Sequence, residues 1–378
     1  MDVSDQMVFG TVVLARFLVT LTIPRFPLPG IVVALVLDAV DQTVFQQFMK
    51  LPLEGYQGYD KALDIYYLAI AYISTLRNWS NYLAFQVSRF LFYYRLVGVA
   101  LFEVWHLRAL LMIFPNTFEY FFIFYETYRL RWDPNQMTRK LLLSAAAFIW
   151  IVKLPQEYWI HIAQLDATDW IKTNIFDVPT EVPWSDIFLD AFGIFLGGGA
   201  LVVLILVAAW WLVTRRLPPT GRKLTFSPDA HQPSFTAEQT RRARASEAAR
   251  IIDSALIEKV VLVSLLSITF AQVLPDVRAT NLQLAIAVAF AITINTALSH
   301  WLARRGSAWA FALREFAVMG VVNLSLVLVY AFWAPNFDGA IDLRNTLFFA
   351  LMLTLMVTLF DHYRQVYLMR FALAAERV

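Results

Sequence analysis

The stretch IFLDAFGIFLGGGALVVLILVAAWWLV, residues 187–213, decides the fold class. It contains a single charged residue, Asp190, and exceeds the roughly 20 apolar residues that a helix needs to cross a bilayer core. The basic sequence TRRLPPTGRK, residues 214–223, follows it directly. A long apolar run that ends in clustered Arg and Lys is typical of a transmembrane helix with its last turn at the cytoplasmic face.

The rest of the chain has the same character. Its 378 residues are 59% hydrophobic and 16% charged, whereas soluble domains carry about 25% charged residues. We therefore predict an all-α, polytopic integral membrane helical bundle with 10–11 transmembrane segments, placed as a multi-pass protein in the cell membrane. The candidate segments are 8–23, 30–46, 62–77, 84–103, 107–127, 141–155, 187–213, 256–274, 281–302, 309–333 and 345–361.

The loops predict most of the orientation. Basic residues cluster in 128–140, in 214–250, before Arg305 and in the C-terminal tail, so these regions and the C-terminus are expected in the cytoplasm. The acidic loop 154–186 is expected on the other side. Segment 84–103 leaves two alternatives open, because it carries two arginines, which are costly inside a bilayer unless they are paired. If it spans, there are eleven spans and the N-terminus lies outside; otherwise there are ten and it lies inside.

Composition divides the chain into three parts. Residues 1–213 form a charged membrane half with segments 1–7, and residues 251–378 form a plainer apolar half with segments 8–11. Residues 214–250 read as a basic, flexible cytoplasmic linker. The net charge of +2 gives no reason to expect nucleic acid, and the lack of cysteine excludes disulfides and thiolate metal sites.

Four aspartates occur where the second segment ends and the third begins. Asp38 and Asp41 are three residues apart, and Asp60 and Asp64 are four apart, so each pair shares a helix face. Two such pairs on neighbouring helices can converge, and converging carboxylates suit hard cations such as Mg²⁺ or Mn²⁺. The alternative is structural: Asp60 caps a helix, while the first pair bonds to Arg16, Arg25 or Lys61.

The spacing of these aspartates resembles the signature of the CDP-alcohol phosphotransferases, D-x-x-D-G-x-x-A-R followed by G-x-x-x-D-x-x-x-D. All four aspartate positions match, whereas the glycine positions are Gln42 and Tyr56 and the Ala-Arg pair is Phe45-Gln46. The resemblance implies that Asp38, Asp41, Asp60 and Asp64 hold divalent metal and that Asp64 is the catalytic base on an acceptor alcohol.

A second polar group lies within residues 89–126. Such groups face a protein interior or a water-filled space when they occur in membrane segments, and arginine binds phosphate or carboxylate well. Pro115-Asn116 should break the helix within this run. The alternative is that ion pairs such as Arg95–Glu103 and Arg108–Glu119 tie helices together. The candidate substrate-binding residues are Arg89, Arg95, Glu103, His106, Arg108, Glu119 and Glu126.

These observations leave three functional hypotheses. The first is a metal-binding membrane enzyme, a transferase in the case of the resemblance, that acts on a lipid or lipid-phosphate and uses Mg²⁺ or Mn²⁺. The second is a transporter or channel that uses buried Glu and Arg as an ion or proton path. The third is a non-catalytic membrane subunit of a complex. The expected partners are membrane phospholipid and a small-molecule or lipid-phosphate substrate, and an oligomer is compatible with the sequence.

Overall fold

The structure, a computed structural model, describes residues 3–48, 56–163, 167–216, 253–274, 280–304, 312–333 and 343–375, with a few positions between 222 and 238. Every regular element within these ranges is helical, which confirms the all-α prediction. Three helical stretches, 254–273, 281–299 and 345–371, are long and apolar enough to cross a membrane by length and composition. Shorter apolar helical stretches cover 7–20, 192–205 and 316–329.

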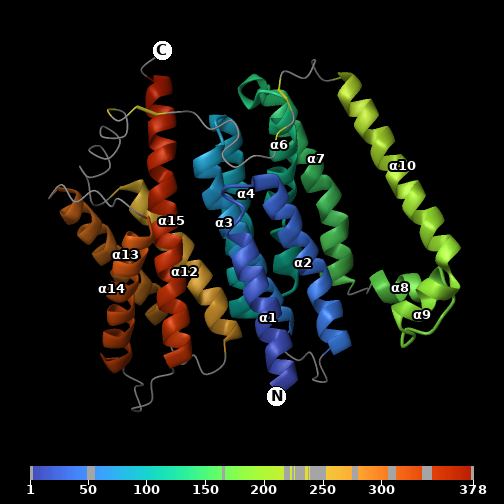
Figure 1. The fold of residues 1–378 in the computed structure, drawn as a ribbon, viewed down its shortest axis with the longest axis horizontal. Coiled ribbons are helices and arrows are strands. Elements are labelled where there is room, and N and C mark those ends of the chain that lie inside the picture. Colours follow the sequence, from blue (N-terminus) through green and yellow to red (C-terminus); the bar gives the residue numbers. More distant parts are fainter. Residues whose placement is uncertain are drawn as a thin grey trace.

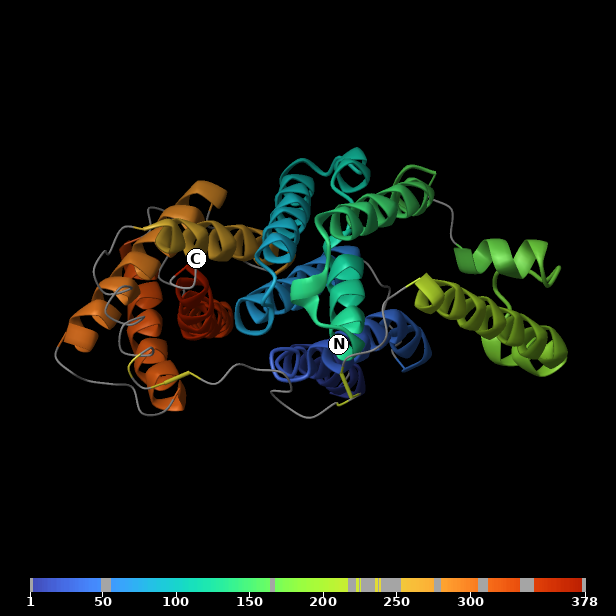
Figure 2. The same cartoon turned by 90° about the horizontal axis from the view of Figure 1, so that it is seen from above.

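The long helices alternate in direction, and the two chain ends lie at opposite ends of the molecule (Figure 1). Seen from above, α12–α15 lie on one side, α1–α7 in the middle and α8–α10 apart on the other side (Figure 2). The long helices in the described ranges are α1 (Val3–Thr20), α2 (Pro27–Phe48), α3 (Tyr56–Asn78), α4 (Tyr82–Trp105), α6 (Phe118–Arg131), α7 (Arg139–Glu157), α10 (Phe192–Arg216), α12 (Ser254–Val273), α13 (Asn281–Arg304), α14 (Ala312–Trp333) and α15 (Leu343–Ala375). The short ones are α5 (Ala109–Ile113), the 3-10 turn η1 (Pro134–Gln136), the π turn η2 (Tyr158–Ile162), α8 (Ala167–Asn174) and α9 (Trp184–Asp190).

Segment 84–103, the uncertain one, is part of the continuous helix α4. The side chain of Asn81 caps its first turn by accepting from the backbone N–H of Ala84 at 3.0 Å. His106 ends it in the left-handed conformation (φ 55°) and donates its backbone N–H to the Phe102 carbonyl at 2.6 Å. At the 1.5 Å rise of an α-helix, this helix is roughly 36 Å long, which is enough to cross a bilayer core.

Segment 107–127 is not one helix. The chain forms the short helix α5, leaves helical geometry at 114–117 and re-enters it as α6. The predicted break at Pro115-Asn116 is therefore confirmed. The backbone of this break lies against α4, because Arg95 of that helix donates to the Phe114 carbonyl at 3.0 Å.

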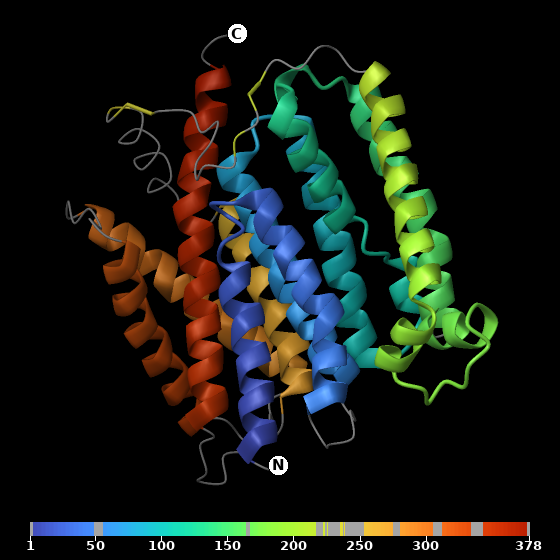
Figure 3. The ribbon, with the colours of Figure 1, turned by 45° about the vertical axis from the view of Figure 1, so that its right-hand side comes forward.

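One end of the bundle is rich in arginine contacts. Arg370 of α15 donates to the Trp79 carbonyl at 2.6 Å, and Arg129 of α6 donates to the Asn78 carbonyl at 2.9 Å. Asn81 donates to the carbonyl of Pro134 at 2.9 Å, so the 79–81 and 132–138 turns adjoin. We call this the basic end, and we call the opposite end, where α1 begins and α4 ends, the N-terminal end (Figure 3).

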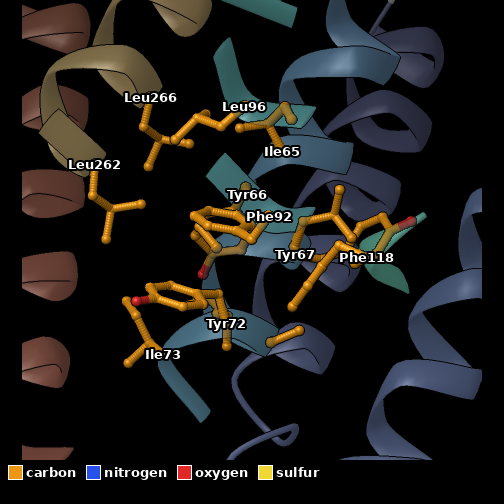
Figure 4. Close-up of a cluster of buried hydrophobic side chains, with 14 of the residues drawn as sticks. Ile65, Tyr66, Tyr67, Tyr72, Ile73, Phe92, Leu96, Phe118, Leu262 and Leu266 are labelled. Atoms are coloured by element: carbon orange, nitrogen blue, oxygen red, sulfur yellow. The ribbon is translucent and has the colours of Figure 1, made fainter. Parts of the chain in front are cut away.

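Helix α3 is the centre of the molecule. It packs against α1, α2, α4, α6, α12 and α15, so helices from both predicted halves meet around it. Its side chains from Ile65 to Ile73 are at most 3% exposed, and the ring of Tyr72 stacks on that of Phe92 with centroids 4.6 Å apart (Figure 4). A helix buried on every side cannot rotate without breaking these contacts. The polar residues at its start are therefore held in fixed directions.

Candidate metal and substrate site

A single arginine joins the four aspartates. Arg16 of α1 is 5% exposed, and its guanidinium contacts Asp38 and Asp41 of α2 as well as Asp60 and Asp64 of α3. Its Nη1 donates to Asp41 and, at 3.1 Å, to Asp60; its Nη2 donates to Asp38 and, at 3.1 Å, to Asp64. Each terminal nitrogen thus bonds one carboxylate from each helix. The predicted convergence of the two pairs is confirmed, as is the pairing of the first pair with Arg16.

The four carboxylates differ in how far they are exposed. The side chains of Asp38, Asp60 and Asp64 are 25%, 31% and 22% exposed, whereas that of Asp41 is 1% exposed. One carboxylate oxygen from each of the first three lies within 4.8 Å of the others. Asp41 lies outside this trio and is held by the arginine. The trio carries more negative charge than one guanidinium can balance. Its carboxylate oxygens are ligands of the kind that Mg²⁺ and Mn²⁺ prefer.

The depth of the cluster differs from the surface position that the sequence suggests. Asp64 follows the first residue of α3 by eight positions, or about 12 Å along the axis, and precedes the last by about 21 Å. The cluster therefore lies two turns inside the bundle and nearer the N-terminal end. Asp60 lies in the second turn of α3, beyond the positions at which a side chain caps a helix.

The candidate substrate residues divide into two sets. Arg89 lies toward the basic end, 3.1 Å from Glu258 of α12 and far along α4 from its last turn. Glu126 accepts from Trp79 Nε1 at 2.7 Å and lies 3.3 Å from Arg129, again at the basic end. Neither residue contacts the aspartates: Arg89 joins α4 to α12, and Glu126 joins α6 to Trp79 in the turn after α3. Arg95, Glu103, His106, Arg108 and Glu119 lie toward the other end, on α4, the α4–α5 turn and the start of α6.

Lys61 is the residue that sequence reasoning assigned differently. The sequence offers Lys61 as one alternative partner for Asp38 and Asp41. In the structure, its Nζ instead lies 4.2 Å from the centroid of the Phe102 ring on α4. Its electrostatic partners are Glu103, Asp60, Arg108 and Arg95. Successive residues of a helix point about 100° apart, so the neighbour of an aspartate that faces α2 must face elsewhere. The adjacency of Lys61 to Asp60 in the sequence was therefore the signal that could have predicted a different direction for the lysine.

Glu119 belongs to a chain of buried hydrogen bonds. It is 3% exposed and accepts from the hydroxyl of Tyr67 and from the side-chain amide of Asn116, both at 2.6 Å. The backbone N–H of Asn116 donates to Glu157 at 3.1 Å, which also pairs with His161 at 3.0 Å. Tyr67 is one helical turn beyond Asp64 and interacts with it electrostatically. Polar groups thus continue from the aspartate cluster to the end of α7.

The alternative ion pairs proposed for this region do not form. In the part of the chain that the structure describes, Arg95 and Glu103 are not within 4.0 Å of each other, and neither are Arg108 and Glu119. The guanidinium of Arg95 instead donates from Nη1 to the Phe114 carbonyl at 3.0 Å. Arg95 thus joins α4 to the break between α5 and α6 through a carbonyl rather than through an acidic partner.

Comparison with known proteins finds no matching protein-family model, no matching curated protein and no matching solved structure.

Proposed function

We propose that the chain is a membrane protein whose long helices cross the bilayer eleven times, with the basic end and the C-terminus in the cytoplasm. The alternating helix directions and the opposite positions of the chain ends support an odd number of crossings. The arginine-rich turns gathered at one end support the orientation, because basic loops are retained in the cytoplasm. On this orientation the aspartate cluster is closer to the exterior face.

We propose that the protein is a divalent-metal-dependent enzyme that acts on a lipid or lipid-phosphate. The observation that carries this proposal is the trio Asp38, Asp60 and Asp64, converged and partly exposed beside a buried arginine. Bound Mg²⁺ or Mn²⁺ would neutralise phosphate oxygens and favour ionisation of an acceptor hydroxyl. Asp64, by the family resemblance, would hold the proton that the acceptor loses, and Arg16 would fix the carboxylates in place.

The substrate in this proposal reaches the site from the membrane. Asp64 lies about 21 Å along α3 from the basic end, so a cytosolic nucleotide would have to cross more than half of the bundle to reach it. The positions where the related signature has glycine for close approach of nucleotide phosphates are Gln42 and Tyr56 here. Both points favour a lipid-linked phosphate over a CDP-linked one.

The test is Mn²⁺ binding by the purified protein, followed by the paramagnetic signal of free Mn²⁺. We expect Asp60→Asn and Asp64→Asn each to weaken binding about tenfold or more, because each removes a charged ligand. Asp41→Asn should weaken it less, since Asp41 lies outside the trio, and Asp133→Asn at the basic end is the distant control. Equal Mn²⁺ affinity in the wild type and both trio variants would overturn the proposal.

A second candidate is a proton- or ion-coupled transporter, favoured by the buried chain from Tyr67 through Glu119 to Glu157. Buried carboxylates in a hydrogen-bonded series are the usual parts of a proton path. This candidate requires that liposomes with the protein carry a flux that empty liposomes lack and that Glu119→Gln alters. Protein-containing liposomes no more permeable than empty ones would contradict it.

A further inference from the structure

We propose that Lys61, Arg95 and Arg108 form a phosphate-binding site beside the aspartate trio, in which a phosphate ester is held. The inference rests on the proposed function for the identity of the ligand, since a phosphate is what cations and a divalent metal bind together. The site itself is inferred from charged groups on α3, α4 and the α4–α5 turn, and from polar atoms on α4 and in the 114–117 break that have no partner among the described residues.

Three cations interact electrostatically here with one another and with the acidic groups Asp60, Glu103 and Glu157, none of which is close enough to form an ion pair with them. The ammonium of Lys61 interacts electrostatically with Arg95 and Arg108 as well as with Asp60 and Glu103. Among the residues that the structure describes, none of the three cations has an acidic group within 4.0 Å. Like charges gathered in a half-buried place repel one another, and a bound anion relieves that repulsion.

Arg95 gives the independent sign of a ligand. The residue is 7% exposed, and within the described ranges its Nε has no hydrogen-bond partner. A buried charged donor that is left unsatisfied has lost its hydration without gaining a hydrogen bond, which is unfavourable. The hydroxyl of Thr117, which is fully buried, also lacks a partner in the described part of the chain. Both are donors of the kind that phosphate oxygens accept.

The unpartnered acceptors indicate that the ligand has donors of its own. Glu103 Oε1 and Asn116 Oδ1 are buried and have no partner among the described residues. A carboxylate next to a phosphate is favourable only when a hydroxyl lies between them. These atoms therefore fit a phosphate ester that carries a hydroxyl, as glycerol 3-phosphate and phosphatidylglycerol do.

The position of Lys61 links this site to the metal trio. Asp60 points toward Arg16, while Lys61, the next residue, points over Phe102 toward α4. The buried helix α3 thus presents a carboxylate to one side and an ammonium to the neighbouring side. A phosphate held by Lys61 is next to the carboxylates that would hold the metal.

The experiment measures binding of inorganic phosphate, glycerol 3-phosphate and dioctanoyl phosphatidylglycerol by calorimetry, with and without Mn²⁺. Lys61→Met keeps the apolar stem on Phe102 but removes the charge, and Arg108→Gln changes a half-exposed residue that makes no ion pair with the described residues. We expect each variant to weaken phosphate binding about tenfold or more while Mn²⁺ binding is retained. Arg89→Gln is the matched control, because that arginine of α4 already pairs with Glu258.

The outcomes separate this inference from the proposed function. Tighter binding of phosphatidylglycerol than of the two soluble phosphates identifies a lipid source, and the reverse identifies a soluble one. Phosphate binding that Lys61→Met abolishes in a protein that takes up no Mn²⁺ supports the anion site and overturns the metal enzyme. The anion site is overturned if wild-type protein binds none of the three probes, or if Arg89→Gln weakens binding as much as Lys61→Met.

Discussion

Arg16 is the residue on which the aspartate cluster depends. One guanidinium bonds carboxylates of two other helices, and both partners of every contact are within the first three long helices. Removing one partner of a buried ionic network leaves the others desolvated and unpaired. Arg16 therefore both holds α1–α3 together and limits the repulsion among the aspartates.

We predict that Arg16→Gln lowers the free energy of unfolding by about 3–5 kcal/mol, the cost of breaking a buried ion pair. Because the aspartates then lack their cation, added Mn²⁺ should restore part of the loss. The measurement is the thermal unfolding midpoint in detergent with and without Mn²⁺. Arg25→Gln, an exposed arginine near the end of α1, is the control and should change little. Equal midpoints for the two variants would show that the cluster does not stabilise the fold.

At this scale the sequence allowed a partial prediction of the site. The three- and four-residue spacings predicted that Asp38 with Asp41 and Asp60 with Asp64 share faces, and the structure brings them together. The central position of Arg16 could not be deduced, because helix periodicity gives a direction for a side chain but not which neighbour it meets. For the same reason, the contact of Lys61 with an aromatic ring on another helix could not be predicted.

Helix α4 shows how an element can carry arginines through an apolar molecule. Arg89 pairs with Glu258 of α12, and Arg95 donates to the Phe114 carbonyl in the break between α5 and α6. That break can approach because Gly98 has no side chain. A Cβ placed on Gly98 would lie 2.1 Å from the Cβ of Phe114, far inside van der Waals contact.

We predict that Gly98→Ala destabilises the protein by about 1–3 kcal/mol, as overpacking of a close contact does, by displacing the 114–117 break from α4. Gly10→Ala is the matched control, since both glycines lie inside helices and a Cβ at Gly10 meets nothing within 4 Å. Alanine favours the helix at both positions, so the difference between their unfolding midpoints isolates the contact with Phe114. A Gly98→Ala midpoint equal to that of Gly10→Ala would contradict the close approach.

The elements themselves were largely predictable. Each predicted segment corresponds to a helix or a pair of helices, because long apolar runs leave few alternatives to a helix. The proline at 115 also predicted the break. What the sequence left open was whether α4 crosses the molecule, since that depends on partners for its arginines that lie 19 and 169 residues further along the chain.

At the scale of the whole molecule, the helix directions place the two ends of α4 at opposite ends of the bundle. Leu107 follows α4 at the N-terminal end and is 58% exposed. Gln136 is exposed in the turn that adjoins the start of α4 through the Asn81–Pro134 hydrogen bond. The two positions thus mark the two faces of the proposed membrane protein.

We predict that a membrane-impermeant maleimide labels Leu107→Cys on intact cells but labels Gln136→Cys only after the membrane is opened. The chain has no cysteine, so each variant carries a single thiol. Denatured samples of both variants, labelled to completion, control for reactivity. Protection of both thiols on intact cells, or labelling of both, would place the two turns on the same side and rule out the eleven-crossing arrangement.

The bonds of Arg16 also bear on how the chain is made. Asp38 and Asp41 follow this arginine by 22 and 25 residues, so the cation is synthesised before the carboxylates that need it. An aspartate at the centre of an inserting helix costs about 2.5–3.5 kcal/mol on the scale of the translocon, and α2 has two. In the proposed membrane protein, α1 can stay beside the translocon while α2 inserts, so that Arg16 partly neutralises the aspartates of α2 as that helix enters the bilayer. The aspartates of α3 can then bind the same arginine. Assembly of the candidate site then begins with the first helix. Exchanging the order of these helices would impair their insertion into the membrane, before any effect on activity.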